Sequence, residues 1–263
     1  MSRQLIIIAN DGGRQNHLPG VAVDVQHYLR FFRQPEAGLW EVGEIKVFDN
    51  NETTLDKQRL SSYILSRRMD GVQFFVIVFC GHGYSNQYGM PFFELSPGND
   101  ASKAEIKQMV ANSRCLMIAD SCRVTYLREG GRMPTVEMFS NTREGDYYRQ
   151  QCKAIYNDTF GNLPLGTFCL GMAASYNQSA SETDSEGGLY STTLIKTAQG
   201  IITKKRSDRH SVTLYQTYSP IETFPVVHAF ASQKVRQATG GQQVPENQVF
   251  GSSRVPFVVV PEL

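Results

Sequence analysis

The sequence contains short, nearly uninterrupted apolar runs that recur between segments of helical character. The strongest are LIIIA within residues 4–9, VQFFVIVF at 72–79 and CLMIA within 114–119. Runs of this length without polar alternation are typical of strands covered on both faces, as in parallel sheets. Since parallel neighbours need a crossover connection, usually a helix, the pattern predicts an α/β protein.

The remaining segments fit the same alternation. Strands are expected at residues 4–9, 41–48, 72–79, 114–119, 166–172 and 255–260, with a short local pairing at 92–95. Helices are expected at residues 20–32, 54–69, 102–110, 147–160, 189–198 and 222–238.

Local signals place several of these boundaries. Thr54 can cap the second helix, and Ser102 with Glu105 forms a capping box at the third. Pro256 suggests that the last strand is an edge strand, and a loop is expected at 199–218. No repeat or linker divides the chain, so we expect one domain, 1–263, with about six mostly parallel strands and helices on both faces.

Charge and composition exclude several classes of protein. Lys plus Arg number 26 and Asp plus Glu 25, a balance that argues against a nucleic-acid binder. No apolar run approaches the length of about 18 residues that a membrane span needs. The start, MSRQLIIIANDGG, lacks the long apolar region of a secretory signal, so a cytoplasmic location is expected.

The five cysteines are scattered and none shows CxxC spacing, which argues against a disulfide framework or a zinc site. Cys115 and Cys169 lie inside apolar runs and Cys152 lies on an expected helix, so these three are predicted to be small buried residues. For the remaining cysteines, Cys80 and Cys122, the alternative is a single reactive thiol among buried structural ones.

Two strand ends carry reactive side chains. His82 lies between Gly81 and Gly83 after the strand at 72–79, and Cys122 follows the strand at 114–119. A strand–helix–strand crossover would bring these ends side by side. Only about 3% of a thiol with an ordinary pKa is ionised at neutral pH, and a nearby imidazole can take its proton. The alternatives are an ordinary loop histidine and a small buried cysteine.

The segments FFVIVFCGHGYS and CLMIADSCRV resemble the caspase-like cysteine peptidases, which include caspases, metacaspases and bacterial relatives. LIIIAND, TFCLGMAASYNQSASETDSEGGLYSTTLIK and QQVPENQVFGSSRVPFVVV agree with the same family. The resemblance covers nearly the whole chain except about 123–145 and 199–220. It implies a caspase-like three-layer sandwich with a large-subunit-like half (1–122), a linker region (123–165) and a small-subunit-like half (166–263).

The same resemblance implies a catalytic dyad of His82 and Cys122. Cys122 would attack a peptide carbonyl to form an acyl-enzyme, with His82 as general acid and base. The backbone N–H groups of Gly83 and Cys122 would stabilise the oxyanion.

Specificity also follows from the resemblance. In metacaspase-like members, acidic residues line the pocket for the side chain before the cut, and Asp24 and Asp120 match two of these positions. Cys80 stands where metacaspases often have serine, and Ser175 opens a run that replaces a second acidic segment. Paired carboxylates suit a guanidinium, so cleavage after Arg, preferred over Lys, is expected. For Asp24 alone, a surface or capping acid is the alternative.

Other features depart from metacaspases. Arg123 stands where they usually carry histidine. The aspartates that bind calcium in many metacaspases are absent after His82, and Glu94, Asp100 and Glu105 are spread out, so no metal or other cofactor is expected.

The arginine-containing segment 123–145 is either an exposed loop or a self-cleaved linker, and the basic run at 204–210 poses the same choice. Expected partners are protein or peptide substrates with basic residues, and control by a regulatory partner protein is plausible.

Other motifs are missing. There is no Walker A, G-x-G-x-x-G, G-x-S-x-G or H-E-x-x-H pattern, and Asn10–Gly13 lacks a phosphate-binding lysine. His17, His27, His210 and His228 are expected at the surface. Two rival functions stay open: a catalytically silent caspase-like scaffold or regulatory module, and a small-ligand-binding α/β domain.

Overall fold

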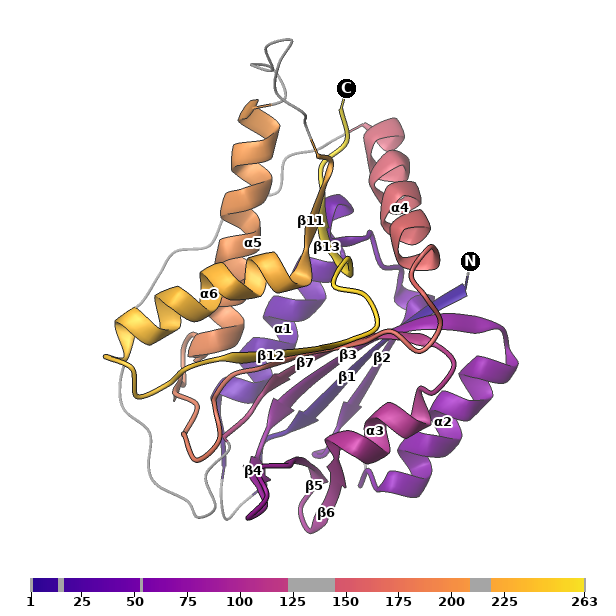
Figure 1. Cartoon of the computed structure of the whole chain (residues 1–263). Coiled ribbons are helices and arrows are strands. Elements are labelled where there is room, and N and C mark those ends of the chain that lie inside the picture. Colours follow the sequence, from indigo (N-terminus) through magenta and orange to yellow (C-terminus); the bar gives the residue numbers. More distant parts are fainter. Residues whose placement is uncertain (1, 14–16, 53, 123–144, 209–218, 263) are drawn as a thin grey trace.

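The computed structural model describes residues 2–13, 17–52, 54–122, 145–208 and 219–262. Its centre is a six-stranded sheet with strand order β12-β8-β7-β3-β1-β2 (Figure 1). Five of its strands are parallel: β1 (Ser2–Asn10), β2 (Ile45–Asp49), β3 (Val72–Gly81), β7 (Arg114–Asp120) and β8 (Phe168–Met172). The sixth, β12 (Glu246–Phe250), pairs antiparallel with β8. The predicted mostly parallel α/β architecture is confirmed.

Helices cover both faces of this sheet, which gives three layers (Figure 1). One face carries α1 (Gly20–Phe32), α4 (Asp146–Gly161), α5 (Leu189–Asp208) and α6 (Phe224–Ala238). The other face carries α2 (Lys57–Met69) and α3 (Lys103–Met109). Two short 3-10 helices, η1 (Pro35–Ala37) and η2 (Val42–Glu44), precede β2.

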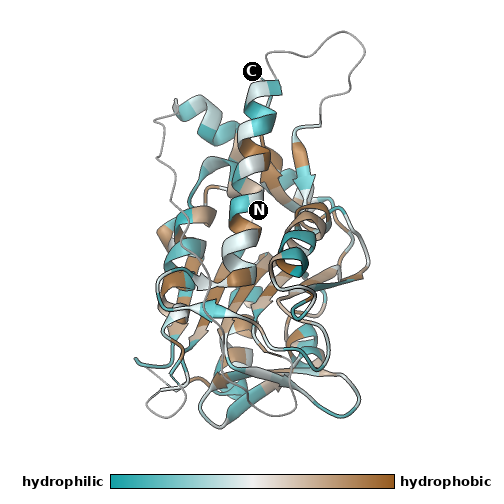
Figure 2. Cartoon of the chain, turned by 90° about the vertical axis from the view of Figure 1, so that its left-hand side faces the viewer, coloured by the Kyte–Doolittle hydropathy of each residue, from teal (hydrophilic) through white to brown (hydrophobic). Residues whose placement is uncertain are grey.

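The two cores follow from the strand period of two. In β1, Leu5 and Ile7 join the core under α1, while Ile6 and Ile8 join the core under α2 and α3. All four side chains are fully buried, and the apolar colouring in Figure 2 concentrates on the strands inside the molecule. This double burial explains why the strand sequences lack polar alternation.

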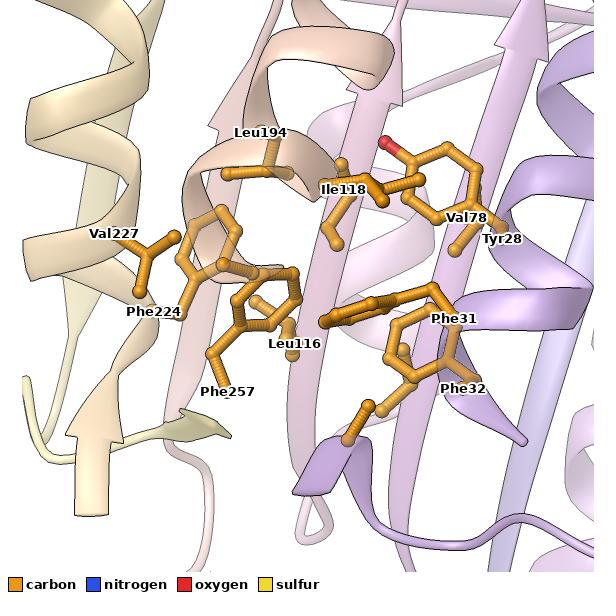
Figure 3. Packing of buried hydrophobic residues seen from close by; sticks show 14 of the residues in the cluster. Tyr28, Phe31, Phe32, Val78, Leu116, Ile118, Leu194, Phe224, Val227 and Phe257 are labelled. Atoms are coloured by element: carbon orange, nitrogen blue, oxygen red, sulfur yellow. The ribbon is translucent and has the colours of Figure 1, made fainter. Parts of the chain in front are cut away.

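Aromatic side chains from distant parts of the chain close the first core. Figure 3 shows Phe31 of α1, Phe224 of α6 and Phe257 gathered over Leu116 of β7. The ring centroids of Phe31 and Phe257 lie 5.1 Å apart, and those of Phe224 and Phe257 5.3 Å apart. Contacts of this kind fix the C-terminal segments against the sheet.

Three small sheets complete the fold. A three-stranded antiparallel sheet of β4 (Gly83–Ser85), β5 (Pro91–Ser96) and β6 (Asn99–Ser102) follows β3, which confirms the local pairing predicted at 92–95. The two others pair β9 (Glu182–Thr183) with β10 (Gly187–Gly188), and β11 (Ile221–Thr223) with β13 (Pro256–Val259).

The sixth strand of the central sheet was predicted wrongly. The apolar segment expected at 255–260 forms β13, which pairs with β11 outside the central sheet, and β12 takes the sheet edge instead. The sequence of β12, ENQVF, is mostly polar because the strand is half-exposed at the edge and needs no apolar run.

Several boundaries also differ from prediction; residues 222–223, expected to begin a helix, belong to β11. Residues 42–44 form η2 before the second strand begins at Ile45. The second helix starts at Lys57, because the Asp56 side chain rather than Thr54 accepts the Arg59 N–H, at 2.7 Å. Helix α5 continues to Asp208, so residues 199–208 are helical and not the expected loop, and 209–218 lies outside the described residues.

The capping box is confirmed, since Ser102 Oγ accepts the Glu105 N–H and the Glu105 carboxylate accepts the Ser102 N–H. Cys115, Cys152 and Cys169 are buried, as predicted. None of the helices in the described ranges combines the length and apolar character that crossing a membrane requires.

Candidate active site

The carboxyl ends of β3 and β7 meet at one edge of the sheet. Cys80 pairs in register with Asp120, so His82 and Cys122 each lie two residues past this pair. The backbone of Gly83 lies against the residue before Cys122: a Cβ on Gly83 would come 2.7 Å from Ser121 Oγ. The structure therefore brings together the two segments that carry the reactive side chains.

The glycines on either side of His82 are required by close approaches. A Cβ on Gly81 would overlap the carbonyl oxygen of Asn10 at the end of β1, and one on Gly83 would also crowd the carbonyl of Phe92. The carbonyl of His82 accepts the Glu94 N–H at 3.0 Å. The half-exposed histidine thus stands on a backbone fixed by β1, β5 and the end of β7.

Cys122 is the one cysteine of the five that is not buried. Its Sγ lies 3.3 Å from the Ala180 nitrogen, which donates to it, and 3.6 Å from the Ala180 carbonyl oxygen. Burial raises the pKa of the Cys122 thiol, and the carboxylates of Asp120 and Glu182 raise it further, against a lowering by the Ala180 N–H. A thiol in this setting needs a base to become a nucleophile.

A small pocket of about 40 Å³ lies beside Cys122 and is lined by three carboxylates. Asp24 of α1 and Asp120 at the end of β7 are buried, and Glu182 of β9 is half-buried. No Lys, Arg or His is among the described residues of this pocket, and no ion pair within the described ranges reaches the three acids.

Backbone N–H groups near the start of α5 hold the two buried carboxylates. The Gly188 N–H donates to both oxygens of Asp24 at 3.0 Å, and the Ser191 N–H donates to Asp120 Oδ2 at 2.8 Å. A helix N-terminus stabilises negative charge in this way. A Cβ on Gly188 would overlap the Asp120 carboxylate, so only glycine permits this approach.

The three acids nevertheless resist ionisation. Burial, and then repulsion by Asp120, raises the pKa of Asp24 well above its usual value, and burial also raises the pKa of Asp120. Burial and the charges of Asp120 and Asp184 raise the pKa of Glu182 to about 7. Because a positively charged ligand stabilises the ionised forms of these acids, the pocket favours a cation.

The residues expected to bind substrate fall into two groups. Asp24 and Asp120 come together in the pocket, so Asp24 is not a surface acid. Cys80 is fully buried, and its thiol pKa is raised by burial and by the charges of these two acids. Ser175 is not among the residues that line the pocket; its Oγ donates to the Val244 carbonyl at 2.8 Å.

Glu182 is the pocket residue that the sequence reasoning missed. The pattern SETDSEGG, in which acids precede a glycine pair, was the available signal. Its meaning depends on the β9–β10 pairing, which folds Glu182 back toward Gly20 at the start of α1. Within the described residues, no three His, Cys, Asp or Glu side chains are arranged to hold a metal ion.

A second pocket, of about 220 Å³, lies at the ends of β1 and β2. Its Asp11 carboxylate accepts hydrogen bonds from the Gly13 N–H and from the amides of Asn50 and Asn51 at 2.9–3.1 Å. A carboxylate at this position repels phosphate, which disfavours the turn at Asn10–Gly13 as a nucleotide loop.

The expectation of a surface position is wrong for His228. This residue is buried, and its Nδ1 lies 2.8 Å from the Tyr190 hydroxyl. Burial lowers its pKa to about 4, although a hydrogen bond to the Pro245 backbone favours the charged form. A buried, neutral imidazole that is hydrogen-bonded to Tyr190 and to the Pro245 backbone is a core residue. His210 lies outside the described residues.

Comparisons with known proteins agree with this architecture. A family model described as Caspase domain matches residues 2–252. Among solved structures, caspase-1 from Spodoptera frugiperda is similar with a TM-score of 0.54 at 12% identity, covering 94% of this chain and 85% of that one. A search of curated proteins gave no match. The caspase fold is thus shared, and the chain belongs to the caspase domain family of cysteine-type peptidases.

Proposed function

We propose that the protein is a cysteine endopeptidase that hydrolyses peptide bonds after basic residues, with Arg preferred over Lys. The observation that supports this most directly is the group of three carboxylates beside the Cys122 thiol, which no cation among the described residues neutralises. A guanidinium offers five N–H donors in a planar fork and can pair with two carboxylates at once, whereas an ammonium acts as a point charge.

The proposed reaction uses His82 and Cys122, which follow the ends of β3 and β7. His82 takes the proton from Cys122, and the sulfur attacks the carbonyl carbon of the scissile bond. The oxyanion accepts hydrogen bonds from the backbone N–H groups of Gly83 and Cys122. When the C–N bond breaks, His82 gives its proton to the leaving amine. A water then hydrolyses the thioester, with His82 as base, and the thiol is restored.

Substrate entry requires a local rearrangement. A pocket of about 40 Å³ holds roughly one or two waters and is too small for an arginine side chain. The Ala180 backbone also contacts Cys122 Sγ at 3.3 Å, where an attacked carbonyl would have to approach. The segment from Ala180 to Glu182 therefore has to move outward to admit the side chain and then to return around it.

The test uses fluorogenic peptides that differ only in the residue before the cleaved bond. We expect the wild type to cleave the arginyl peptide fastest and the lysyl peptide more slowly, with the aspartyl and alanyl peptides nearly inert. Cys122→Ala should remove all turnover and keep the folded state, as measured by circular dichroism. Preferred cleavage of the aspartyl peptide would contradict the proposed specificity.

Covalent labelling separates this proposal from a catalytically silent scaffold. An arginyl chloromethyl ketone should alkylate Cys122 at one equivalent, detected by mass spectrometry, and should leave Cys122→Ala unlabelled. An unlabelled wild type would favour the scaffold.

Self-processing is a second part of the proposal. The arginines at 123–144 lie outside the described residues, as does 209–210, and the basic residues 204–206 belong to the end of α5. We expect two fragments from purified wild type that are absent from Cys122→Ala.

A further inference from the structure

Gln243 is a fully buried polar residue in the connection between α6 and β12. It is 1% exposed and does not line the acid pocket. Its Oε1 accepts the Ser181 N–H at 3.0 Å, and its Nε2 donates to the Ala173 carbonyl at 2.9 Å. The amide thus reaches both ends of the loop at 173–181 that follows β8.

The two contacts define one orientation of the Gln243 amide. The oxygen faces an N–H group and the nitrogen faces a carbonyl, so a flipped amide would lose both hydrogen bonds. The backbone of Gln243 is itself anchored, because its N–H donates to Thr239 Oγ1 at 3.1 Å at the end of α6. The residue therefore acts as a fixed support for the loop.

Both ends of the loop matter to the site. Ala173 is held to the end of β7, since its N–H donates to the Ala119 carbonyl at 2.9 Å. Ser181 stands between Ala180, whose N–H contacts the sulfur of Cys122, and Glu182, which lines the acid pocket. Ser181, which Gln243 holds, is therefore next in the chain to Ala180, which contacts the Cys122 sulfur, and to Glu182, the third carboxylate of the pocket.

Neighbouring contacts tie the middle of the loop to the same connection. Gln178 Oε1 accepts the Val244 N–H at 2.8 Å, and Ser175 Oγ donates to the Val244 carbonyl at 2.8 Å. These contacts and the Gln243–Ser181 bond are half-buried, whereas the Gln243–Ala173 bond is buried. Removing a buried partner leaves a desolvated group unsatisfied, so Gln243 should dominate the attachment.

We propose that Gln243 is a positioning residue that sets the place of Ala180, Ser181 and Glu182 relative to Cys122, and thereby determines how a basic side chain is bound. The inference rests on the proposed basic specificity. Gln243 touches no reacting atom; it acts through the backbone of Ser181.

The experiment compares Gln243→Met with Gln242→Met. The first keeps the side-chain length and removes both hydrogen bonds, and the second changes the exposed neighbour. We expect Gln243→Met to raise KM for the arginyl peptide roughly tenfold with a smaller change in kcat. Its preference for Arg over Lys should narrow, and amide hydrogen exchange in peptides covering 173–182 should accelerate. Gln242→Met should match the wild type.

A third variant tests the two bonds separately. In Gln243→Glu the carboxyl keeps an acceptor for Ser181 but needs a proton to donate to Ala173. We therefore expect its KM, relative to the wild type, to improve as the pH falls, whereas Gln243→Met should show no such recovery.

Several outcomes would overturn the inference. Unchanged KM and unchanged exchange in Gln243→Met would do so, and so would an equal fall of kcat for every peptide at constant KM, which indicates only less folded enzyme. If the wild type cleaves no basic peptide, the proposed function fails, and hydrogen exchange at 173–182 still decides whether Gln243 holds the loop.

Discussion

The two sides of the active site are built differently. His82, Asp120 and Cys122 follow directly from β3 and β7, two central strands whose register fixes where each chain segment emerges. Ala180 and Glu182 belong to a stretch after β8 that is supported by side-chain hydrogen bonds to Gln243 and by a two-residue strand pairing. The pairing of β3 with β7 fixes the side that carries His82 and Cys122, whereas the side that carries Ala180 and Glu182 is a loop attached by hydrogen bonds.

This difference separates chemistry from recognition. The proposed nucleophile and base need constant geometry, which strand ends buried in a parallel sheet provide. The pocket has to open for a substrate side chain and close around it, which a loop held by a few hydrogen bonds allows. Variants on the two sides should therefore affect different kinetic parameters.

After the complete loss expected for Cys122→Ala, the largest effect is expected for His82→Ala on the fixed side. Loss of the general acid and base should lower kcat for the arginyl peptide by roughly 10²–10⁴-fold. KM should change little because the acid pocket is intact, and steady-state kinetics will measure both. If His82→Ala instead raised KM and left kcat unchanged, His82 would act in substrate recognition, and the two sides of the site would not differ as described.

Asp24→Asn tests the charge of the pocket. The amide keeps an acceptor for Gly188 but removes one negative charge, so kcat/KM for the arginyl peptide should fall by roughly 10–100-fold. An alanyl peptide should be unaffected. Equal losses on both peptides would indicate a structural rather than a recognition role.

The same variant should be more stable. Because the pKa of Asp24 is raised in the folded protein, ionisation of Asp24 costs stability as the pH rises above the ordinary value for a carboxyl group. Asp24→Asn should therefore increase the free energy of unfolding by about 1 kcal/mol at pH 8, measured by urea denaturation. The gain should disappear at pH 4, where the carboxyl of Asp24 is already protonated in the folded state.

Glu182→Gln tests the loop side through pH. With a pKa of about 7, Glu182 is largely neutral at pH 6 and charged at pH 8, so KM for the arginyl peptide should fall as the pH rises through this range. In Glu182→Gln this pH dependence of KM should flatten, with a loss of roughly tenfold at pH 8 and a smaller loss at pH 6. If the pH dependence of KM persisted in Glu182→Gln, another ionisable group would be responsible for it.

The smallest effect is expected for Ser175→Ala. The hydroxyl of Ser175 contacts Val244 rather than the pocket, so kcat/KM should change less than about threefold and the preference for Arg over Lys should stay. A shift of preference toward other residues would return Ser175 to the substrate-binding group and sharpen the view of the loop.

The side of the site at the ends of β3 and β7 could be predicted from the sequence, whereas the loop side could not. The apolar strands and the meeting of the ends that carry His82 and Cys122 were accessible, because double burial leaves a continuous apolar pattern and a strand–helix–strand crossover returns the chain beside itself. Asp24 and Asp120 were accessible only through the resemblance to metacaspase-like members. The edge strand β12 escaped because a half-exposed strand needs no such pattern.

The loop side could not be derived in this way. Glu182 enters the pocket through the local β9–β10 pairing, whose place beside Gly20 of α1 is set by the fold, and Gln243 reaches Ser181, 62 residues away in sequence, from the connection after α6. The acids that precede a glycine pair were the one sequence signal for Glu182, and Gln243 has no periodicity or spacing that indicates its role. Their positions depend on hydrogen bonds between side chain and backbone, which act over a few ångströms and are specific to the folded arrangement.

By itself, then, the sequence determined the layered α/β fold and the strand ends from which the reactive side chains emerge, since burial imposes a residue pattern along each strand. Only the tertiary structure decided that three carboxylates share one pocket and that a buried glutamine supports the loop beside the thiol. The physical reason is range: hydrophobic patterning is local in the chain, whereas charge repulsion and hydrogen bonding depend on which distant groups are brought within contact.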